Sequence, residues 1–175
     1  MDSKKSERIG GYEIAFAVND NYVVLLSVAI QSLLSNSKST LVINVLYSSL
    51  SQKNMSFLKE MIKKFDTAVK FHRIDAVTFT CLPEMGHLSL EAYYRLAIPS
   101  LIKSDRVLYL DCDILVTGDL SAICDFDISE YPLAAIEDPA FQPIELLDMS
   151  PGSTYFNSGV MLLNLKYLRD FDLAN

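Results

Sequence analysis

The sequence predicts an α/β fold in which a mainly parallel sheet carries helices on both faces. Short apolar runs typical of buried strands alternate with segments whose apolar residues recur every three or four positions, as on one face of a helix. The alternation reads β-α-β-α-β-α-β up to Leu110. Such a pattern favours parallel strands joined by crossover helices. No internal repeat or flexible linker interrupts it, so one domain is expected.

Each element follows from its local pattern. The run YEIAFAV at residues 12–18 reads as a buried strand, and a polar NDN turn follows it. Apolar residues at i+4 spacing between Leu25 and Leu34 then predict a helix that stops at the SNSKS cluster. The same reasoning predicts strand 41–47, helix 55–65, strand 68–74, a helix near 88–98, strand 106–110, strands 132–137 and 160–163, and a helix-like stretch at 165–175. Pro99 is expected to help end the third helix.

Composition and charge narrow the function classes. A net charge of -7 disfavours nucleic-acid binding, since contacts to a phosphate backbone need clustered Lys and Arg. No apolar stretch approaches the roughly 20 residues of a membrane-spanning helix, and the start MDSKKSERIGG lacks the apolar region of a secretory signal. The cysteines Cys81, Cys112 and Cys124 form no CxxC pair, which suits a reducing compartment. A cytoplasmic protein without a transmembrane segment is therefore expected.

Two carboxylates follow the apolar run in RVLYLDCDILVTGDL. Asp111 and Asp113 would point to one side of an extended chain and Cys112 to the other, so both carboxylates can reach one ion. Asp oxygens without a partner His or Cys on that side favour hard cations such as Mn²⁺ or Mg²⁺ over Zn²⁺. Ligands of open parallel sheets gather at the carboxyl ends of strands. The polar NDNY cluster after the first strand is therefore expected at the same edge.

The DxD pattern also admits other interpretations. The carboxylates could cap the strand end or form a solvated turn. An EF-hand calcium loop is excluded, because it needs Asp or Asn at Leu115 and Gly at Val116. A phosphatase of the haloacid dehalogenase type also places DxD after an apolar strand, with Asp111 as the nucleophile. That class usually has DxDx(T/V) near the start of the chain, whereas here Leu115 stands at the fifth position and three β-α units come first.

Five segments carry a family resemblance, in the order FAVNDNY, EAYYRLAIPSLI, VLYLDCDILVTGDL, LAAIEDP and YFNSGVMLLNLKYLRDF. Together they resemble glycosyltransferase family 8, the retaining UDP-sugar transferases that include bacterial lipopolysaccharide galactosyl- and glucosyltransferases. The resemblance implies a GT-A fold, a nucleotide-binding α/β layer in which DxD holds Mn²⁺, or Mg²⁺, against the diphosphate of the sugar donor. Residues 1–11 are then expected to be an N-terminal tail. Residues 12–175 would form a nucleotide-sugar-binding domain that lacks its C-terminal part.

The resemblance also implies roles for individual residues. Asp111 and Asp113 are the expected metal ligands. The expected nucleotide contacts are Ala17, Asn19, Asn21, Tyr22 and Cys112. The expected contacts to the donor sugar or diphosphate are His87, Arg95, Asn157, Ser158 and Gly159. Asp138 is expected on the acceptor side. Three simpler interpretations stay open, namely that NDNY caps the following helix, that Arg95 is solvated and that His87 is a surface residue. Asp119 is expected to cap a short helix after it.

The function that the resemblance implies is hexose transfer from UDP-galactose or UDP-glucose to a hydroxyl of a saccharide or glycolipid, in bacterial surface-glycan or lipopolysaccharide synthesis. No side chain offers itself as a nucleophile, so retention is expected through front-face attack assisted by the departing phosphate. The location would be the cytoplasm, or the inner face of the membrane. The alternatives are the phosphatase, a non-catalytic nucleotide-sugar-binding module, and a self-glucosylating protein resembling glycogenin, for which nine tyrosines are available. The sequence does not distinguish galactose from glucose.

The end of the chain generates a first prediction. Family members run on beyond the length of this chain, and their further part supplies a His that completes the metal site. We therefore expect the 175-residue chain to bind UDP weakly, to transfer no sugar at an ordinary rate, and to self-associate through apolar surface. A transfer assay and size-exclusion chromatography measure both properties. Robust transfer by a monomer shown by intact mass to end at Asn175 would contradict the expectation.

Overall fold

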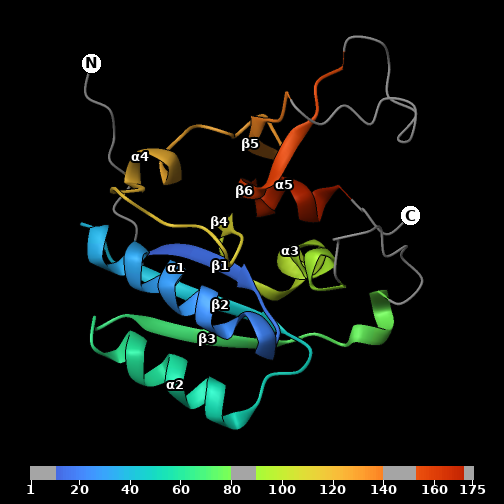
Figure 1. Ribbon diagram of the computed structural model, residues 1–175. Coiled ribbons are helices and arrows are strands. Elements are labelled where there is room, and N and C mark those ends of the chain that lie inside the picture. Colours follow the sequence, from blue (N-terminus) through green and yellow to red (C-terminus); the bar gives the residue numbers. More distant parts are fainter. Residues whose placement is uncertain (1–10, 80–89, 140–152, 172–175) are drawn as a thin grey trace.

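A computed structural model describes residues 11–79, 90–139 and 153–171, and it contains a six-stranded sheet in the order β3-β2-β1-β4-β6-β5 (Figure 1). The strands are β1 (Tyr12–Ala17), β2 (Leu41–Tyr47), β3 (Ala68–Arg73), β4 (Arg106–Leu110), β5 (Leu133–Glu137) and β6 (Phe156–Asn164). The α-helices are α1 (Val23–Asn36), α2 (Gln52–Lys63), α3 (Ile98–Leu101), α4 (Ser121–Cys124) and α5 (Leu165–Asp170). The 3-10 helices are η1 (Asp20–Tyr22), η2 (Ala76–Phe79) and η3 (Leu90–Ala97).

The sheet is mainly parallel, as predicted. β3, β2, β1 and β4 are parallel neighbours, whereas β6 runs antiparallel to both β4 and β5. The chain builds outward from β1 to β2 and β3, and then returns to place β4 on the other side of β1. The connections that leave the carboxyl ends of β1 and β4 therefore diverge. In open α/β sheets a ligand crevice forms at such a switch point.

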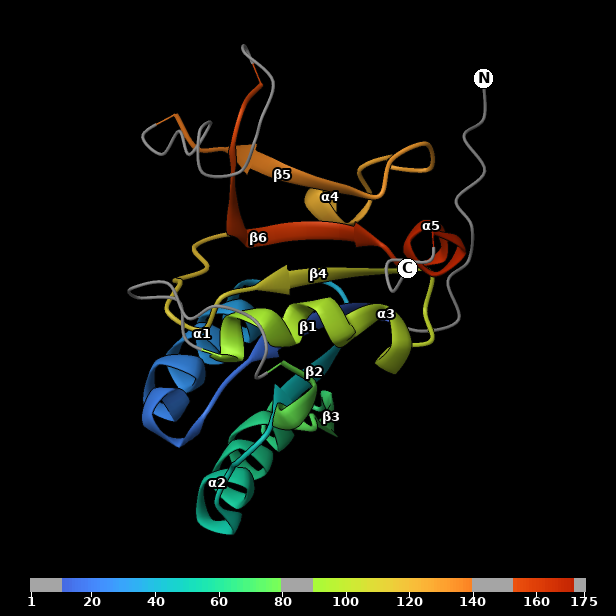
Figure 2. The ribbon, with the colours of Figure 1, turned by 90° about the vertical axis from the view of Figure 1, so that its right-hand side faces the viewer.

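Helices cover both faces of the sheet, which confirms the second part of the predicted fold class. α1 and α2 lie on one face, and η3, α3 and α5 lie on the other (Figure 2). Alternate residues of β1 supply the two cores: Ile14 and Phe16 pack toward α1, and Ala15 and Ala17 pack toward η3. Because β1 is buried on both faces, its sequence is an unbroken apolar run from Ile14 onward.

The third predicted helix differs from the expectation. Residues Leu90–Ala97 form the 3-10 helix η3, and a single α-helical turn, α3, continues directly from it. Pro99 lies in the first turn of α3 and does not end a helix, so that expectation was wrong. The reason is that a proline in a first helical turn removes an N–H that has no intrahelical partner anyway.

The C-terminal strand is longer than predicted. β6 begins at Phe156, ahead of the expected start at Val160, because pairing with β5 continues to Glu137 opposite Phe156. The register shifts between Ala135, which pairs with Met161, and Ile136, which pairs with Asn157, so the extra residues at this irregularity belong to β6. Residues 157–159 consequently belong to a strand whose first part lies next to the carboxyl end of β4.

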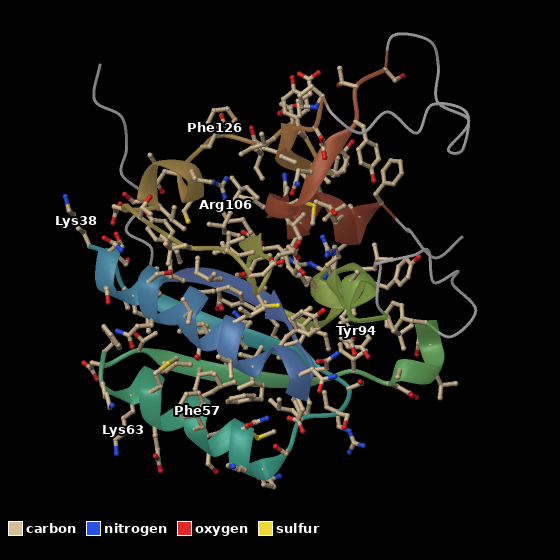
Figure 3. All side chains as sticks on the ribbon, viewed as in Figure 1. Lys38, Phe57, Lys63, Tyr94, Arg106 and Phe126 are labelled. Atoms are coloured by element: carbon tan, nitrogen blue, oxygen red, sulfur yellow. The ribbon has the colours of Figure 1, made fainter. Side chains whose placement is uncertain are left out.

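Two side chains fix the segment between β4 and β5. Asp119 accepts hydrogen bonds from the backbone N–H and the hydroxyl of Ser121 at the start of α4, although the N-cap position itself is Leu120, which makes no side-chain cap. Asp119 also accepts from the N–H of Lys38, 2.7 Å away, which ties this segment to the end of α1. Arg106 donates to the carbonyls of Cys124 and Phe126 and holds α4 against β4 (Figure 3).

A polar network crosses the sheet on the face opposite α1 and α2. Asn44 is fully buried on β2 and donates to a Glu13 carboxylate oxygen on β1 at 2.6 Å. Its side-chain oxygen lies 2.8 Å from Nε2 of His72 on β3, and Lys70 pairs with Glu13 at 3.0 Å. Each strand of this half of the sheet contributes to the network, so the buried amide of Asn44 is satisfied.

This network makes stability depend on pH. Burial lowers the pKa of His72 below its ordinary value of 6.5, Lys70 lowers it further, and Glu13 opposes them. The unfolded chain therefore takes up a proton before the folded protein does, so His72 destabilises the fold as the pH falls below 6.5. Between about pH 7.5 and about pH 5.5, we expect urea midpoints to fall more for the wild-type protein than for His72→Gln, which keeps a donor for Asn44. Equal falls in both proteins would contradict this role.

Candidate functional site

A pocket of about 230 Å³ lies at the carboxyl ends of β1 and β4, at the switch point of the sheet. Three segments line it. The turn after β1 contributes Ala17, Val18, Asn19 and Tyr22, η3 contributes Glu91, Ala92 and Arg95, and β4 with the turn after it contributes Tyr109, Asp111, Cys112 and Asp113. The two polar clusters that the sequence placed at one edge of the sheet are therefore brought together.

The turn after β1 is held in a fixed shape. Asn19 accepts a hydrogen bond from the N–H of Asn21 at 3.0 Å and caps the short helix η1. The long helix α1 starts after Tyr22 without a side-chain cap, so the capping interpretation holds for η1 and not for α1. Asp20 accepts from the backbone N–H of Ser51 and from the side chain of Asn54, both at 2.9 Å, which anchors the turn to the start of α2. Tyr22 lines the pocket with 45% of its surface exposed, which leaves its ring open to a planar ligand.

The carboxylate of Asp111 is already paired with a cation. The Arg95 guanidinium lies 3.1 Å from its Oδ1, and the Tyr109 hydroxyl lies 2.8 Å from the same oxygen. Asp113, in contrast, is exposed. The chain turns at Cys112 and Asp113 and does not remain extended as expected, yet both carboxylates still line one pocket.

Arg95 is a bound side chain and not a solvated one. Only 13% of its side chain is exposed. Besides Asp111, it donates from Nε to the carbonyl of Ala92 at 2.6 Å and to the carbonyl of Ser158 on β6. Its guanidinium also lies over the ring of Tyr109, with 4.6 Å between Cζ and the ring centroid. The open interpretation of Arg95 as a solvated surface residue was therefore wrong.

The start of β6 packs directly behind Asp111. The Asp111 N–H donates to the carbonyl of Gly159 at 2.7 Å, and the Gly159 N–H donates to the Asn157 side chain at 2.8 Å. A methyl group added at Gly159 would lie 2.7 Å from Oδ2 of Asp111. Glycine is needed here because the carboxylate occupies the space of a side chain.

The pKa values of Cys112 and Tyr109 in the pocket are raised, which favours the neutral form of each side chain. Burial, with the Asp113 and Asp111 carboxylates adding to it, raises the pKa of Cys112 to about 11. Burial also raises the pKa of Tyr109 above its ordinary value, against the opposing charge of Arg95. At neutral pH the Cys112 thiol and the Tyr109 hydroxyl are both protonated, so neither is an anionic nucleophile.

The oxygen ligands in the pocket fit a hard divalent cation. Asp111 and Asp113 supply carboxylate oxygens, the ligand type that Mn²⁺ and Mg²⁺ prefer. Within residues 11–79, 90–139 and 153–171, no group of three or more His, Cys, Asp or Glu side chains is placed so that it could hold one metal ion. An ion held by these two carboxylates would therefore take further ligands from water or a bound phosphate.

The other predicted residues lie at different distances from this pocket. Asn21 is exposed and does not line it. Asp138 follows β5, where its N–H donates to the carbonyl of Tyr155 beside the start of β6. His87 falls outside the described residues. The sequence analysis missed two pocket residues, Glu91 and Tyr109. The i, i+2 spacing of Tyr109 and Asp111 along an extended chain could have shown that their side chains point to the same side of the strand.

A second cavity, of about 480 Å³, adjoins the first and is apolar. Arg95 lines both cavities, and Leu96, Leu133, Met161 and Phe171 are among the walls of the second. Leu96 and Phe171 are 60% and 62% exposed. Exposed apolar side chains, which the expected self-association requires, are therefore present. Self-association itself stays a prediction.

The fold and the pocket define an α/β protein with a mainly parallel sheet and a pocket at its switch point. A sequence model described as glycosyl transferase family 8 matches residues 13–175, and the chain belongs to this family. In a solved structure, galactosyltransferase LgtC in complex with donor and acceptor sugar analogs superposes with a TM-score of 0.84 at 30% identity, over 91% of this chain and 60% of that one. The expected GT-A fold is thereby confirmed.

Curated relatives point to the same family. General stress protein A of Bacillus subtilis is 35% identical over 163 residues, covering 89% of this chain and 57% of the relative. The lipopolysaccharide 1,2-glucosyltransferase of Escherichia coli is 28% identical, covering 89% of this chain and 48% of the relative. The lipopolysaccharide 1,3-galactosyltransferase of Salmonella typhimurium is 27% identical, covering 88% of this chain and 48% of the relative. The chain thus spans about half the length of the curated relatives it matches. The family match does not favour the phosphatase or the non-catalytic alternative.

No helix among the described residues is both long and apolar enough to cross a membrane.

The close fit at Gly159 generates a stability prediction with a matched control. In Gly159→Ala, the new methyl group would lie 2.7 Å from Asp111 Oδ2 and 3.0 Å from Asn157 Oδ1, so the Arg95–Asp111 pair has to shift. We expect a loss of about 1–3 kcal/mol in the free energy of unfolding, measured with urea. Gly118→Ala, where nothing lies within 4 Å of the added carbon, should stay near wild type. Equal stabilities of the two variants would contradict the packing described.

Proposed function

We propose that this protein transfers a hexose from a UDP-sugar, UDP-galactose or UDP-glucose, to a hydroxyl of a saccharide or glycolipid acceptor, with retention of anomeric configuration and with Mn²⁺ or Mg²⁺. One observation carries the proposal. The Asp111–Asp113 pair and the turn at Asn19 and Tyr22 line one pocket at the switch point of the sheet. The lipopolysaccharide glycosyltransferases among the relatives support a place in bacterial surface-glycan synthesis.

The nucleoside would bind at the turn after β1. Tyr22 offers an exposed ring on which a base can stack, and Ala17 offers backbone groups at the strand end. Asn19 carries both an amide donor and an acceptor; its oxygen already accepts from Asn21, so its NH₂ is the group left for the uracil edge. Cys112 also lines the pocket, as a neutral thiol.

The diphosphate would face the carboxylates, and charge makes a cation necessary there. Asp111, Asp113 and Glu91 all line the pocket, whereas Arg95 is the cation that the described residues contribute to it. A divalent metal would neutralise the excess and would stabilise the charge that develops on the leaving UDP. Asp111 and Asp113 are the residues that would hold it.

The sugar and the acceptor would lie toward the start of β6. Asn157 and Ser158 lead into Gly159 behind the metal ligands, and Asp138 follows the neighbouring strand at the same edge of the sheet. Their amide, hydroxyl and carboxylate groups suit sugar hydroxyls. The described part of the pocket offers no anionic Cys or Tyr as a nucleophile, which favours front-face attack over a covalent intermediate at those groups.

The test is metal-dependent UDP binding, measured by calorimetry. We expect UDP to bind with Mn²⁺, to lose most of its affinity in a chelator, and to lose it in Asp113→Ala with Mn²⁺ present. Asp105→Ala is the matched control: it removes the same charge from an 81%-exposed side chain next to the amino end of β4, away from the pocket. Equal UDP affinity in chelator and in Mn²⁺, or in both variants, would overturn the proposal.

The donor and the stereochemistry need separate measurements. Thermal shifts with a panel of UDP-sugars in Mn²⁺ should rank UDP-galactose or UDP-glucose first, because a ligand bound only by the folded state raises the midpoint. Product analysis of any transfer reaction should show the anomeric configuration of the donor. An inverted product would contradict retention while leaving the binding proposal in place.

A further inference from the structure

The hydroxyl of Tyr109 is directed at the metal-binding motif from inside the protein. Tyr109 lies on β4, two residues before Asp111, and only 1% of its surface is exposed. Its hydroxyl oxygen is 2.8 Å from Asp111 Oδ1. A carboxylate oxygen only accepts hydrogen bonds, so the phenol donates.

Arg95 acts on the same oxygen. Its guanidinium donates to Asp111 Oδ1 at 3.1 Å and stacks on the Tyr109 ring at 4.6 Å. Its remaining anchors are the carbonyls of Ala92 and Ser158, so the guanidinium is fixed on three sides. The two donors use both lone-pair positions of Oδ1. Oδ2 receives neither of them and lies against Gly159.

We propose that Tyr109 is a positioning residue. Together with Arg95 it occupies Oδ1 of Asp111 with hydrogen bonds and so leaves Oδ2 as the single oxygen of Asp111 that binds the metal. The inference rests on the proposed function, because it assigns the geometry of the same metal site. Asp111 is then a monodentate ligand with one orientation, and the exposed Asp113 carboxylate adapts around the ion. Hydrogen bonds from outside the ligand shell commonly set ligand orientation and affinity in this way.

The alternative is that Tyr109 only fills the core. Its ring belongs to the apolar cluster between the sheet and the η3 side, where a phenylalanine would pack as well. The two roles differ in the hydroxyl alone. Tyr109→Phe removes the donor to Asp111 and keeps the ring under Arg95, so the variant separates positioning from packing.

Tyr94 provides the matched control. It is fully buried in the same apolar cluster, on η3 next to Arg95 (Figure 3). Its ring packs against that of Phe79. Tyr94→Phe makes the same chemical change at equal burial without touching Asp111. Any effect that the two variants share reports on loss of a buried hydroxyl in general.

The experiment measures Mn²⁺ affinity by electron paramagnetic resonance in the presence of UDP, with urea unfolding of the metal-free proteins alongside. Tyr109→Phe should bind Mn²⁺ about 10-fold more weakly, as for the loss of other orienting hydrogen bonds, and the spectrum of the bound ion should change. Tyr94→Phe should bind Mn²⁺ as the wild-type protein does, even if both variants lose stability.

Asp113→Ala separates a failure of the positioning role of Tyr109 from a failure of the proposed function. If Asp113→Ala abolishes Mn²⁺ binding while Tyr109→Phe binds like wild type, the positioning role is overturned and the proposed function stands. If Tyr109→Phe and Tyr94→Phe weaken Mn²⁺ equally, the positioning role is also overturned. If Asp113→Ala binds Mn²⁺ and UDP like wild type, the proposed function itself fails.

Discussion

The parallel pairing of β1 with β4 is the constraint on which the site depends. Ile14 pairs with Leu108 and Ala15 with Tyr109, so the two strands end at the same edge of the sheet. Their connections then leave in opposite directions, because β2 and β6 lie on their outer sides. A crevice results that neither segment could form alone. The turn after β1 and the Asp111–Asp113 segment, far apart in sequence, become walls of one pocket.

Electrostatics in this pocket is balanced locally and not by the protein as a whole. The chain carries a net charge of -7, and its general field disfavours the approach of a diphosphate. Arg95 compensates one carboxylate from a position that is 13% exposed, where screening by water is reduced. Asp113 remains exposed, and Glu91 adds further negative charge to the pocket lining. The pocket thus retains negative charge that suits a cation before any anionic ligand arrives.

The sequence predicted those features that depend on local periodicity. The strand at residues 41–47 was predicted with the bounds observed for β2, and the family resemblance was confirmed by the family match. The 3-10 conformation of η3 and the position of Pro99 could not be read from apolar spacing, since tertiary packing decides between related helical forms. The contact of Arg95 with Ser158 was equally hidden, because β6 enters the sheet beside β4 only through long-range antiparallel pairing. The assigned roles of individual site residues remain predictions.

The position of β6 between β4 and β5 limits how the length of the chain can vary. Leu110 pairs with Val160, which places Gly159 opposite Asp111, and pairing with β5 holds β6 on its other side. Side chains alternate between the faces of a strand, so inserting or deleting one residue between Val160 and Asn164 would exchange the two faces of β6 and place another side chain against Asp111. Related chains can therefore gain or lose residues in their connecting segments, whereas the length of this strand is fixed by its neighbours.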